Sequence, residues 1–166
     1  MCEYMDSEFI SIIKPILEMK EFQKLKDVSH HGSNRFDHSL RVAYFSYKIT
    51  KFFHLNYQEA TIAALLHDFF IDEVDNNQML LRLRRHPNHA LENAKRIWNL
   101  SPLQEDVIKT HMFPITFIPP KYLESWVVDI VDDGASIYER GYNIRREIKT
   151  VTTFLLLFII NYIKFQ

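Results

Sequence analysis

Glycine and proline are scarce in this chain, with three glycines and six prolines among 166 residues. An all-β fold needs many turns, so this scarcity argues against one and favours long helices. The single cysteine, Cys2, excludes an intramolecular disulfide framework and a cysteine-based zinc cage. A net charge of −1 provides no field that would attract nucleic acid or an anionic membrane surface. We therefore expect no nucleic-acid polymer and no membrane among its partners.

The ends of the chain carry no clear targeting signal. The opening MCEYMDSEFI is acidic and lacks the basic region of a secretory signal, and with one cysteine this favours the cytoplasm. The apolar run VTTFLLLFII (151–160) is soon interrupted by Asn161 and Lys164. It is shorter than the roughly 18 to 20 apolar residues that span a bilayer. We expect it to close the core or to form a protein interface, and a homodimer is one such arrangement.

No repeat, low-complexity tract or linker divides the chain, so we treat residues 1–166 as a single domain. Apolar residues recur at helical spacing and predict an all-α bundle of about six or seven helices, without a convincing strand pair. Ser7 is the expected cap of the first helix, which Pro15 kinks or splits, and residues 27–34 form a loop. Asn56 is expected to cap a later helix, with Glu59 in the capping-box position.

Further helix starts follow from the placement of prolines. Pro87 suits the first turn of a helix over NHALENAKRIW. Ser101, Pro102 and Gln104 combine a cap, a first-turn proline and a capping-box partner, and this helix should end near His111. The Pro119–Pro120 pair is expected to open the next helix, and a final helix is expected over residues 144–165.

Histidines and aspartates gather near the ends of these helices and in the late apolar segment VVDIVDD. They are His38, His67, Asp68, His86, His89, His111, Asp129, Asp132 and Asp133. Burying such groups is costly unless they are paired or bound to a metal. Helical bundles commonly build metal sites from side chains on facing helices, so this set predicts a metal site in a shared cavity.

Five segments also follow one another in a familiar order: RFDHSLRVA, AALLHDFF, HPNHALENA, VIKTHMFP and VVDIVDD. Over residues 33–140 this order resembles the HD-domain metal-dependent phosphohydrolase superfamily. The pattern HP..AL.NA followed by HM.P is similar to an uncharacterised bacterial branch of that superfamily.

The resemblance implies the metal ligands and the chemistry. The first metal would be held by His38, His67, Asp68 and Asp132, and a second by a bridging Asp68 with His86 and His111. Mixed His and Asp ligands suit one or two divalent transition-metal ions: Mn, Fe, Co, Ni or Zn. Such ions generate hydroxide at neutral pH and polarise a phosphoryl oxygen, which makes Asp68 and His67 the candidate catalytic residues.

Two ligand positions have alternatives. Asp132 fits the family pattern best, whereas Asp129 lies one turn earlier and is its rival; Asp133 is expected to face solvent or to form a local cap. His86, directly before proline, is preferred to His89, which is expected to be exposed or to support the ligands.

Substrate contacts are less specific. Arg35 matches an arginine common in the superfamily, and it binds phosphate or pairs with a carboxylate. Lys109 and the arginines of RLRRH (residues 82–86) are candidates for anion contacts, against the alternative of a solvated face. Many relatives place glycine and lysine after the HD pair, where this chain has Phe69 and Phe70. We expect these two rings to pack in the core.

Together these features predict a phosphohydrolase that acts on a nucleotide or another small phosphorylated metabolite, with a metal-activated hydroxide as nucleophile. Two alternatives stay open. One is a sensor module that binds metal and nucleotide without turnover, and the other is a di-iron oxygenase, a chemistry that some HD-fold proteins perform.

Overall fold

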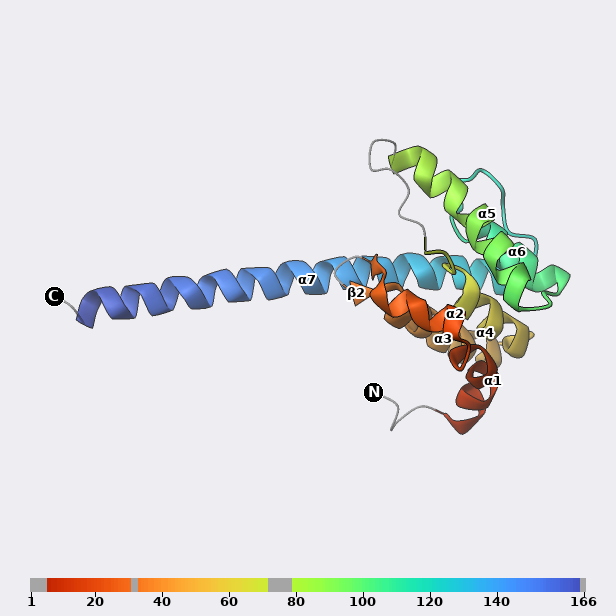
Figure 1. The fold of residues 1–166 in the computed structure, drawn as a ribbon, viewed down its shortest axis with the longest axis horizontal. Helices are drawn as coiled ribbons and strands as arrows, with labels where there is room; N and C mark the ends of the chain where they lie inside the picture. Colours follow the sequence, from red (N-terminus) through yellow and green to blue (C-terminus); the bar gives the residue numbers. More distant parts are fainter. Residues whose placement is uncertain (1–5, 31–32, 72–78, 165–166) are drawn as a thin grey trace.

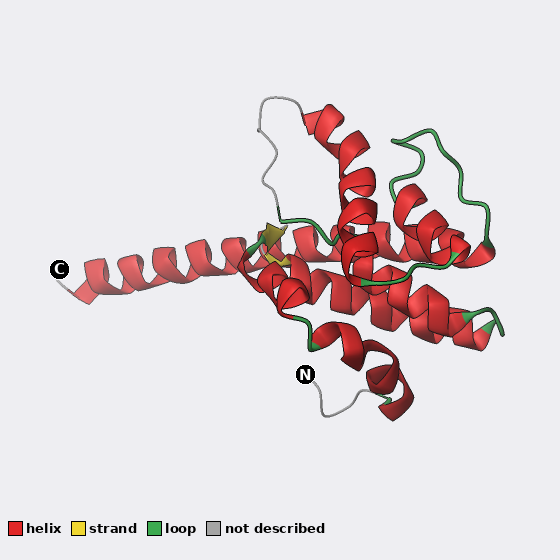
Figure 2. Ribbon diagram, turned by 45° about the vertical axis from the view of Figure 1, so that its right-hand side comes forward, coloured by secondary structure: helices red, strands yellow, loops and turns green. Residues whose placement is uncertain are grey.

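Helices account for most of the computed structural model, which describes residues 6–30, 33–71 and 79–164. The elements are α1 (Ser7–Leu17), α2 (Lys20–Gln23), the 3-10 helix η2 (Lys24–Asp27), β1 (Ser29–His30), β2 (Ser33–Asn34), α3 (Arg35–Phe52), α4 (Tyr57–Leu66), α5 (Met79–Ile97), α6 (Pro102–Thr110) and α7 (Leu123–Lys164). The all-α prediction is confirmed, with seven α-helices in these residues (Figure 2).

A small antiparallel ladder departs from the prediction of a plain loop over residues 27–34. It pairs Ser29 with Asn34 and His30 with Ser33. Strands of two residues are too short to show the alternating pattern by which a strand is recognised in a sequence. The ladder ends where α3 begins, and the Asn34 side chain caps that helix by accepting a hydrogen bond from the Asp37 N–H at 2.8 Å.

Much of the apolar core comes from α1, α3 and α4, and α5, α6 and α7 add residues such as Ala90, Val107 and Val128. Phe9 and Ile13 of α1 and Tyr47 of α3 are fully buried, and the Phe9 and Tyr47 ring centroids are 5.4 Å apart. The last four residues of α4, from Ala63 to Leu66, are also fully buried. Each large apolar side chain buried in this way contributes about 1.5 to 3 kcal/mol. This packing fixes the C-terminal end of α4, where His67 and Asp68 follow.

Two of the predicted helix starts need correction. Asp6, and not Ser7, caps α1, because its side chain accepts the Glu8 N–H at 3.0 Å. Asn56 caps α4 as predicted, but Glu59 does not complete a capping box. The Asn56 N–H instead donates to Oε1 of Glu124 on α7 at 2.9 Å. The Glu124 carboxylate of α7 has therefore taken the place of Glu59 as the partner of the Asn56 N–H. No local sequence pattern indicates such a long-range contact.

The start of α6 agrees with the sequence in full. Ser101 and Gln104 form a reciprocal capping box with Pro102 in the first turn, and the helix ends at Thr110 with His111 as its C-cap. These signals are reliable because all their partners lie within four residues.

Two helices are longer than predicted. Since α5 begins at Met79, Pro87 lies inside it and not in its first turn. α7 starts three residues after the Pro119–Pro120 pair and runs unbroken to Lys164, so the expected separate helix from Ile144 is wrong. No proline follows Pro120 to stop the helix. The later half of α7 extends well beyond the bundle (Figure 1).

In the part of the chain that the structure describes, every helix lacks an apolar run long enough to cross a membrane.

Candidate metal centre

His38 lies in the first turn of α3, where it is fully buried. Its Nε2 is 2.8 Å from Oδ1 of Asp132 on α7. Its Nδ1 is 3.1 Å from Oε1 of Glu139, two turns further along the same helix. A carboxylate on each nitrogen fixes both the position and the plane of this ring.

His67 is also fully buried and completes this first cluster from the end of α4. Its Nδ1 is 2.7 Å from the carbonyl oxygen of Ala64, which can only accept. When the ring is neutral, it therefore carries its proton on Nδ1 and presents a lone pair at Nε2. That Nε2 lies 3.5 Å from Oδ1 of Asp132 and makes no hydrogen bond to any described residue.

Asp68, His86 and His111 form a second cluster. Nε2 of His86 and Nε2 of His111 are 2.8 Å apart. Oδ1 of Asp68 lies 3.5 Å from the former and 3.8 Å from the latter. The Nδ1 of His111 is 2.7 Å from the carbonyl oxygen of Ile108, so His111 has the same tautomer as His67 when neutral.

The two clusters lie side by side. Ring centroids are 5.4 Å apart for His38 and His67, 5.0 Å for His67 and His111, and 4.9 Å for His111 and His86. Within each cluster of three residues, the potential ligand atoms lie within 4.8 Å of one another. The structure thus gathers the six residues that the sequence singled out, from α3, the end of α4, α5, the end of α6 and α7.

The donor chemistry of the second cluster fits a divalent cation. Burial lowers the pKa of His86 to about 3, and burial and the neighbouring His67 lower that of His111. Both rings are therefore neutral at pH 7, as metal ligands must be. Two neutral imidazole nitrogens converge with a buried carboxylate, and a cation between them would satisfy all three.

The first cluster also suits a divalent cation, because such an ion can replace a proton that the cluster holds. Burial alone would lower the pKa of His38, but the hydrogen bonds to Asp132 and Glu139 raise it to about 10. Burial would raise the pKa of Asp132, yet the charges of His67 and His38 hold it well below its usual range. Without metal, a proton thus stands between His38 and Asp132. A divalent ion can take its place.

The rival candidates lie away from both clusters. Asp129 is buried and accepts a hydrogen bond from the Phe113 N–H at 3.2 Å. Asp133 is exposed, as expected, and His89 is partly exposed. Of the residues that the structure describes, neither Asp129 nor His89 belongs to a group that could hold a metal. The geometry therefore favours Asp132 over Asp129 and His86 over His89 as ligands.

Asp68 departs in one respect from the implied arrangement. It groups with His86 and His111, and not with the first cluster. Its other oxygen, Oδ2, lies 3.6 Å from Nε of Arg35. The bridging role of Asp68 stays a prediction.

Arg35 is buried and shows the geometry of the carboxylate-pairing alternative. Besides its contact with Asp68, its Nη1 donates to the carbonyl oxygen of Phe70 at 2.6 Å. Its guanidinium carbon lies 3.7 Å from the centroid of the Phe70 ring. That ring stacks in turn on His86 at 5.3 Å, and Phe69 packs on Phe22. Both phenylalanines belong to the core, as expected.

Lys109 is exposed and takes no part in either cluster; it lines a separate cavity. Conversely, Glu139 is buried beside His38 and also receives a hydrogen bond from Arg41, a residue of α3. Glu139 was not among the residues predicted from the sequence. Its signal is the spacing of seven residues from Asp132, which places the two carboxylates on one face of a helix.

Comparison with known proteins agrees with this geometry. The family model described as "HD domain" matches residues 35–133, which include all six clustered residues. Searches of curated proteins and of solved structures return no match. Because the matched segment covers more than half of the chain, this protein belongs to the HD-domain family.

Proposed function

We propose that this protein is a metal-dependent phosphohydrolase acting on a nucleotide or another small phosphorylated metabolite. The observation that carries the proposal is the pair of adjacent His/Asp clusters, in a chain of the HD-domain family. Bound divalent ions would supply Lewis-acid activation of water and of a phosphoryl oxygen. The proposed ligands are His38, His67, Asp132, Asp68, His86 and His111.

The chain's own residues orient this site. Backbone carbonyl oxygens of Ala64 and Ile108 fix the tautomers of His67 and His111, and Glu139 holds His38. Arg35 helps to hold the Asp68 carboxylate in place, because its Nε lies 3.6 Å from Oδ2 of Asp68. These contacts act before substrate arrives, so the site needs little rearrangement during the reaction.

Exposure indicates where a substrate would approach. His38 and His67 are fully buried, whereas Asp132 is 7% exposed and His86 is 8% exposed. We therefore propose that an approaching phosphoryl group meets His86 and Asp132 before the fully buried ligands.

The test is phosphate release from a panel of nucleotides and small phosphate esters, with added Mn²⁺ or Co²⁺. Replacing Asp68 by alanine should abolish both metal retention and turnover. Exposed Asp133 provides the matched control, because Asp133→Ala should retain both. Full activity in the Asp68→Ala variant would overturn the proposal.

A sensor that binds without turnover is the second candidate, favoured by one observation. The two positions after the HD pair are buried phenylalanines, and Arg35 is engaged by Asp68 and Phe70. Saturable nucleotide binding without phosphate release across the panel would favour this function. Product formation that depends on oxygen would instead indicate the oxygenase.

A further inference from the structure

The face of α7 that points away from the bundle is apolar. Leu123, Ile130 and Ile137 recur on it every seven residues, and they are 66%, 65% and 72% exposed. The opposite face of the same helix is buried and carries Asp132 and Glu139 toward His38. One side of α7 thus serves the metal centre, while the other side presents apolar side chains to solvent.

A spacing of four and three residues in alternation extends this apolar face along the whole helix, and we call these positions the seam. They are Leu123, Val127, Ile130, Gly134, Ile137, Gly141, Ile144, Ile148, Val151, Leu155, Phe158 and Tyr162. All are apolar or glycine, and no charged residue of α7 falls on any of them. This spacing is that of a coiled coil, and it persists for longer than the three to four heptads that identify one.

Gly134 and Gly141 support the same interpretation. A Cβ added to either glycine would meet no atom within 4 Å, so both positions are open. Glycine weakens the interior of a helix relative to alanine, and it is used where another backbone must approach closely. Two glycines one heptad apart on an exposed face therefore suit a second helix packed against them.

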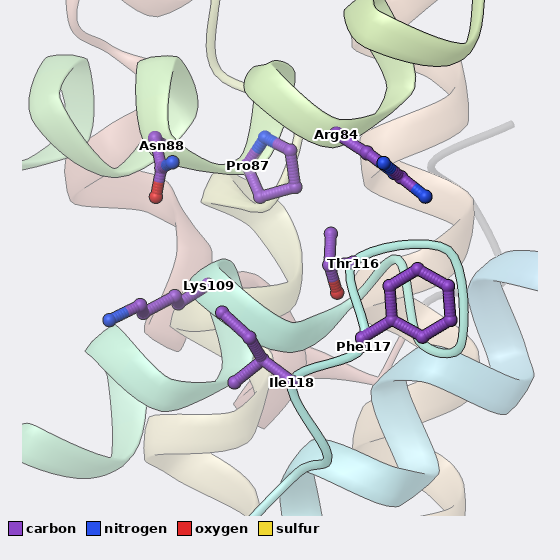
Figure 3. A pocket seen from close by; sticks show the side chains of 7 residues that line it. All are labelled: Arg84, Pro87, Asn88, Lys109, Thr116, Phe117 and Ile118. Atoms are coloured by element: carbon purple, nitrogen blue, oxygen red, sulfur yellow. The ribbon is translucent and has the colours of Figure 1, made fainter.

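Exposure alone does not mark an interface, because single apolar side chains are common on protein surfaces. Phe117 is 73% exposed, yet the guanidinium carbon of Arg84 lies 5.1 Å from the centroid of its ring (Figure 3). The seam differs from such a residue because its apolar positions are regularly spaced and continue for the length of a helix.

A second copy of α7 matches the length of the seam. The 42 residues of α7 extend about 63 Å, and a width of about 10 Å gives a contact area of about 600 Å² from each copy. Two such areas reach about 1,200 Å², the lower limit for specific interfaces. The next longest of the described helices, α5 and α3, have 19 and 18 residues and would cover less than half of the seam.

The order of residues along the seam favours two helices that run in opposite directions. Both glycines lie in its first half, whereas every position from Ile144 onward is a larger apolar residue. Opposite directions would place the glycines against these larger residues, and facing large and small residues pack without voids. Helices in the same direction would instead place glycine against glycine.

Charges beside the seam favour the same direction. With full overlap, position 140 lies beside position 147 of an antiparallel partner, which pairs arginine with glutamate. In a parallel pair, position 140 lies beside position 145, and both are arginine.

We propose that the seam of α7 binds a second copy of this chain, whose own α7 packs along it in the opposite direction. This interface goes beyond the proposed hydrolytic function and requires neither metal nor substrate. The pair would be symmetric, with the same face of α7 contributed by each copy.

The first test is the mass of the full chain by sedimentation equilibrium, which should be twice 19.9 kDa. Combined Ile130→Glu and Ile137→Glu substitutions should weaken association roughly a hundredfold or more, because each would bury an unpaired charge. Both side chains are exposed in the single chain, so circular dichroism should show an unchanged helix content.

Tyr142→Glu is the matched control, because Tyr142 is an exposed ring of α7 that lies outside the seam. It should leave the dimer intact. A monomeric full chain, or a dimer that both variants retain, would overturn the proposal. A monomer that floats with vesicles of phosphatidylcholine and phosphatidylglycerol would also overturn it, in favour of a membrane surface.

The second test measures direction, with a spin label at Lys121→Cys in a Cys2→Ser background. Lys121 is exposed and lies two residues before α7. Antiparallel helices would separate the two labels by about 60 Å, nearly the length of α7. Labels that lie side by side would show a parallel pair and overturn the proposed direction. Neither test measures turnover, so both are independent of whether the metal centre hydrolyses anything.

Discussion

Glu139 holds His38 through both of its carboxylate oxygens, which lie 3.1 and 3.2 Å from Nδ1 of the imidazole. Arg41, one turn after His38 on α3, donates a hydrogen bond to the same carboxylate. The opposite nitrogen of the ring faces Asp132. A carboxylate behind an imidazole fixes its tautomer and makes it a stronger ligand, so Glu139 would support the proposed metal centre without belonging to either cluster.

Replacing Glu139 by glutamine should lower the affinity for divalent metal about 10- to 100-fold. The amide oxygen can still accept from Nδ1, but the negative charge that makes His38 more basic is lost. Competition with a chromogenic chelator, with Co²⁺ as the probe, measures this change directly.

Glu124→Gln is the matched control, since Glu124 is another buried carboxylate of α7 and caps α4 through the Asn56 N–H. This variant should lose stability, by about 1 kcal/mol, and keep its metal affinity. Equal losses of metal affinity in both variants would show that Glu139 acts only on folding.

The Asp132→Asn variant should lose its bound metal, whereas the Asp129→Asn variant should retain it. Asp132 faces His38 and His67, whereas Asp129 accepts a hydrogen bond from the backbone of Phe113. Metal content per chain after gel filtration, determined by mass spectrometry, distinguishes the two. Loss of metal in the Asp129 variant alone would reverse the ligand assignment.

The same Asp129→Asn substitution should stabilise the metal-free protein at high pH. Burial and the neighbouring Asp133 raise the pKa of Asp129 to about 7, against an ordinary value of 3.8. Between these two pKa values, Asp129 keeps its proton in the folded chain and releases it in the unfolded chain. The free energy of unfolding therefore falls as the pH rises from about 4 to 7. Above pH 7 Asp129 is ionised in both states, so the loss in free energy of unfolding stays constant.

Thermal unfolding of both proteins across this pH range measures the effect. The variant should gain about 2 kcal/mol at pH 8, and the gain should vanish near pH 4. A gain that is the same at pH 4 and pH 8 would mean that the charge of Asp129 is not its cause.

Metal binding at neutral pH should release at least one proton, from His38. The pKa of this imidazole is raised to about 10, so the ring is charged in the metal-free protein and must lose its proton to become a ligand. Apparent affinity should therefore rise about tenfold per pH unit between pH 6 and 9. Calorimetry in buffers of different ionisation enthalpy counts the protons; a count of zero would exclude His38 as a ligand.

Local patterns predicted the parts of the molecule whose partners are close in sequence. The capping box of Ser101 and Gln104, the cap at Asn56 and the all-α class follow from signals within one or two turns. The six clustered residues were found through their types and order, which the resemblance to HD domains made interpretable.

Long-range contacts account for what was missed. Glu124 reaches Asn56 across 68 positions, and Glu139 reaches His38 across 101 positions. The grouping of Asp68 with His86 and His111 depends on how the interior of α5 packs against the ends of α4 and α6, which spacing along the chain does not encode. The sequence analysis expected a separate final helix from Ile144, whereas α7 runs unbroken from Leu123 to Lys164.

The length of α7 has a mechanical consequence for His38. Asp132 and Glu139 are seven residues apart, about 10.5 Å along the axis at 1.5 Å per residue, and they hold the two nitrogens of one ring. These two contacts therefore fix the position of α7 along its own axis relative to His38. The half of α7 that extends beyond the bundle continues this segment without a break (Figure 1). Movement of that half along the helix axis would therefore displace both carboxylates that contact His38, one of which is a ligand in the proposed metal centre.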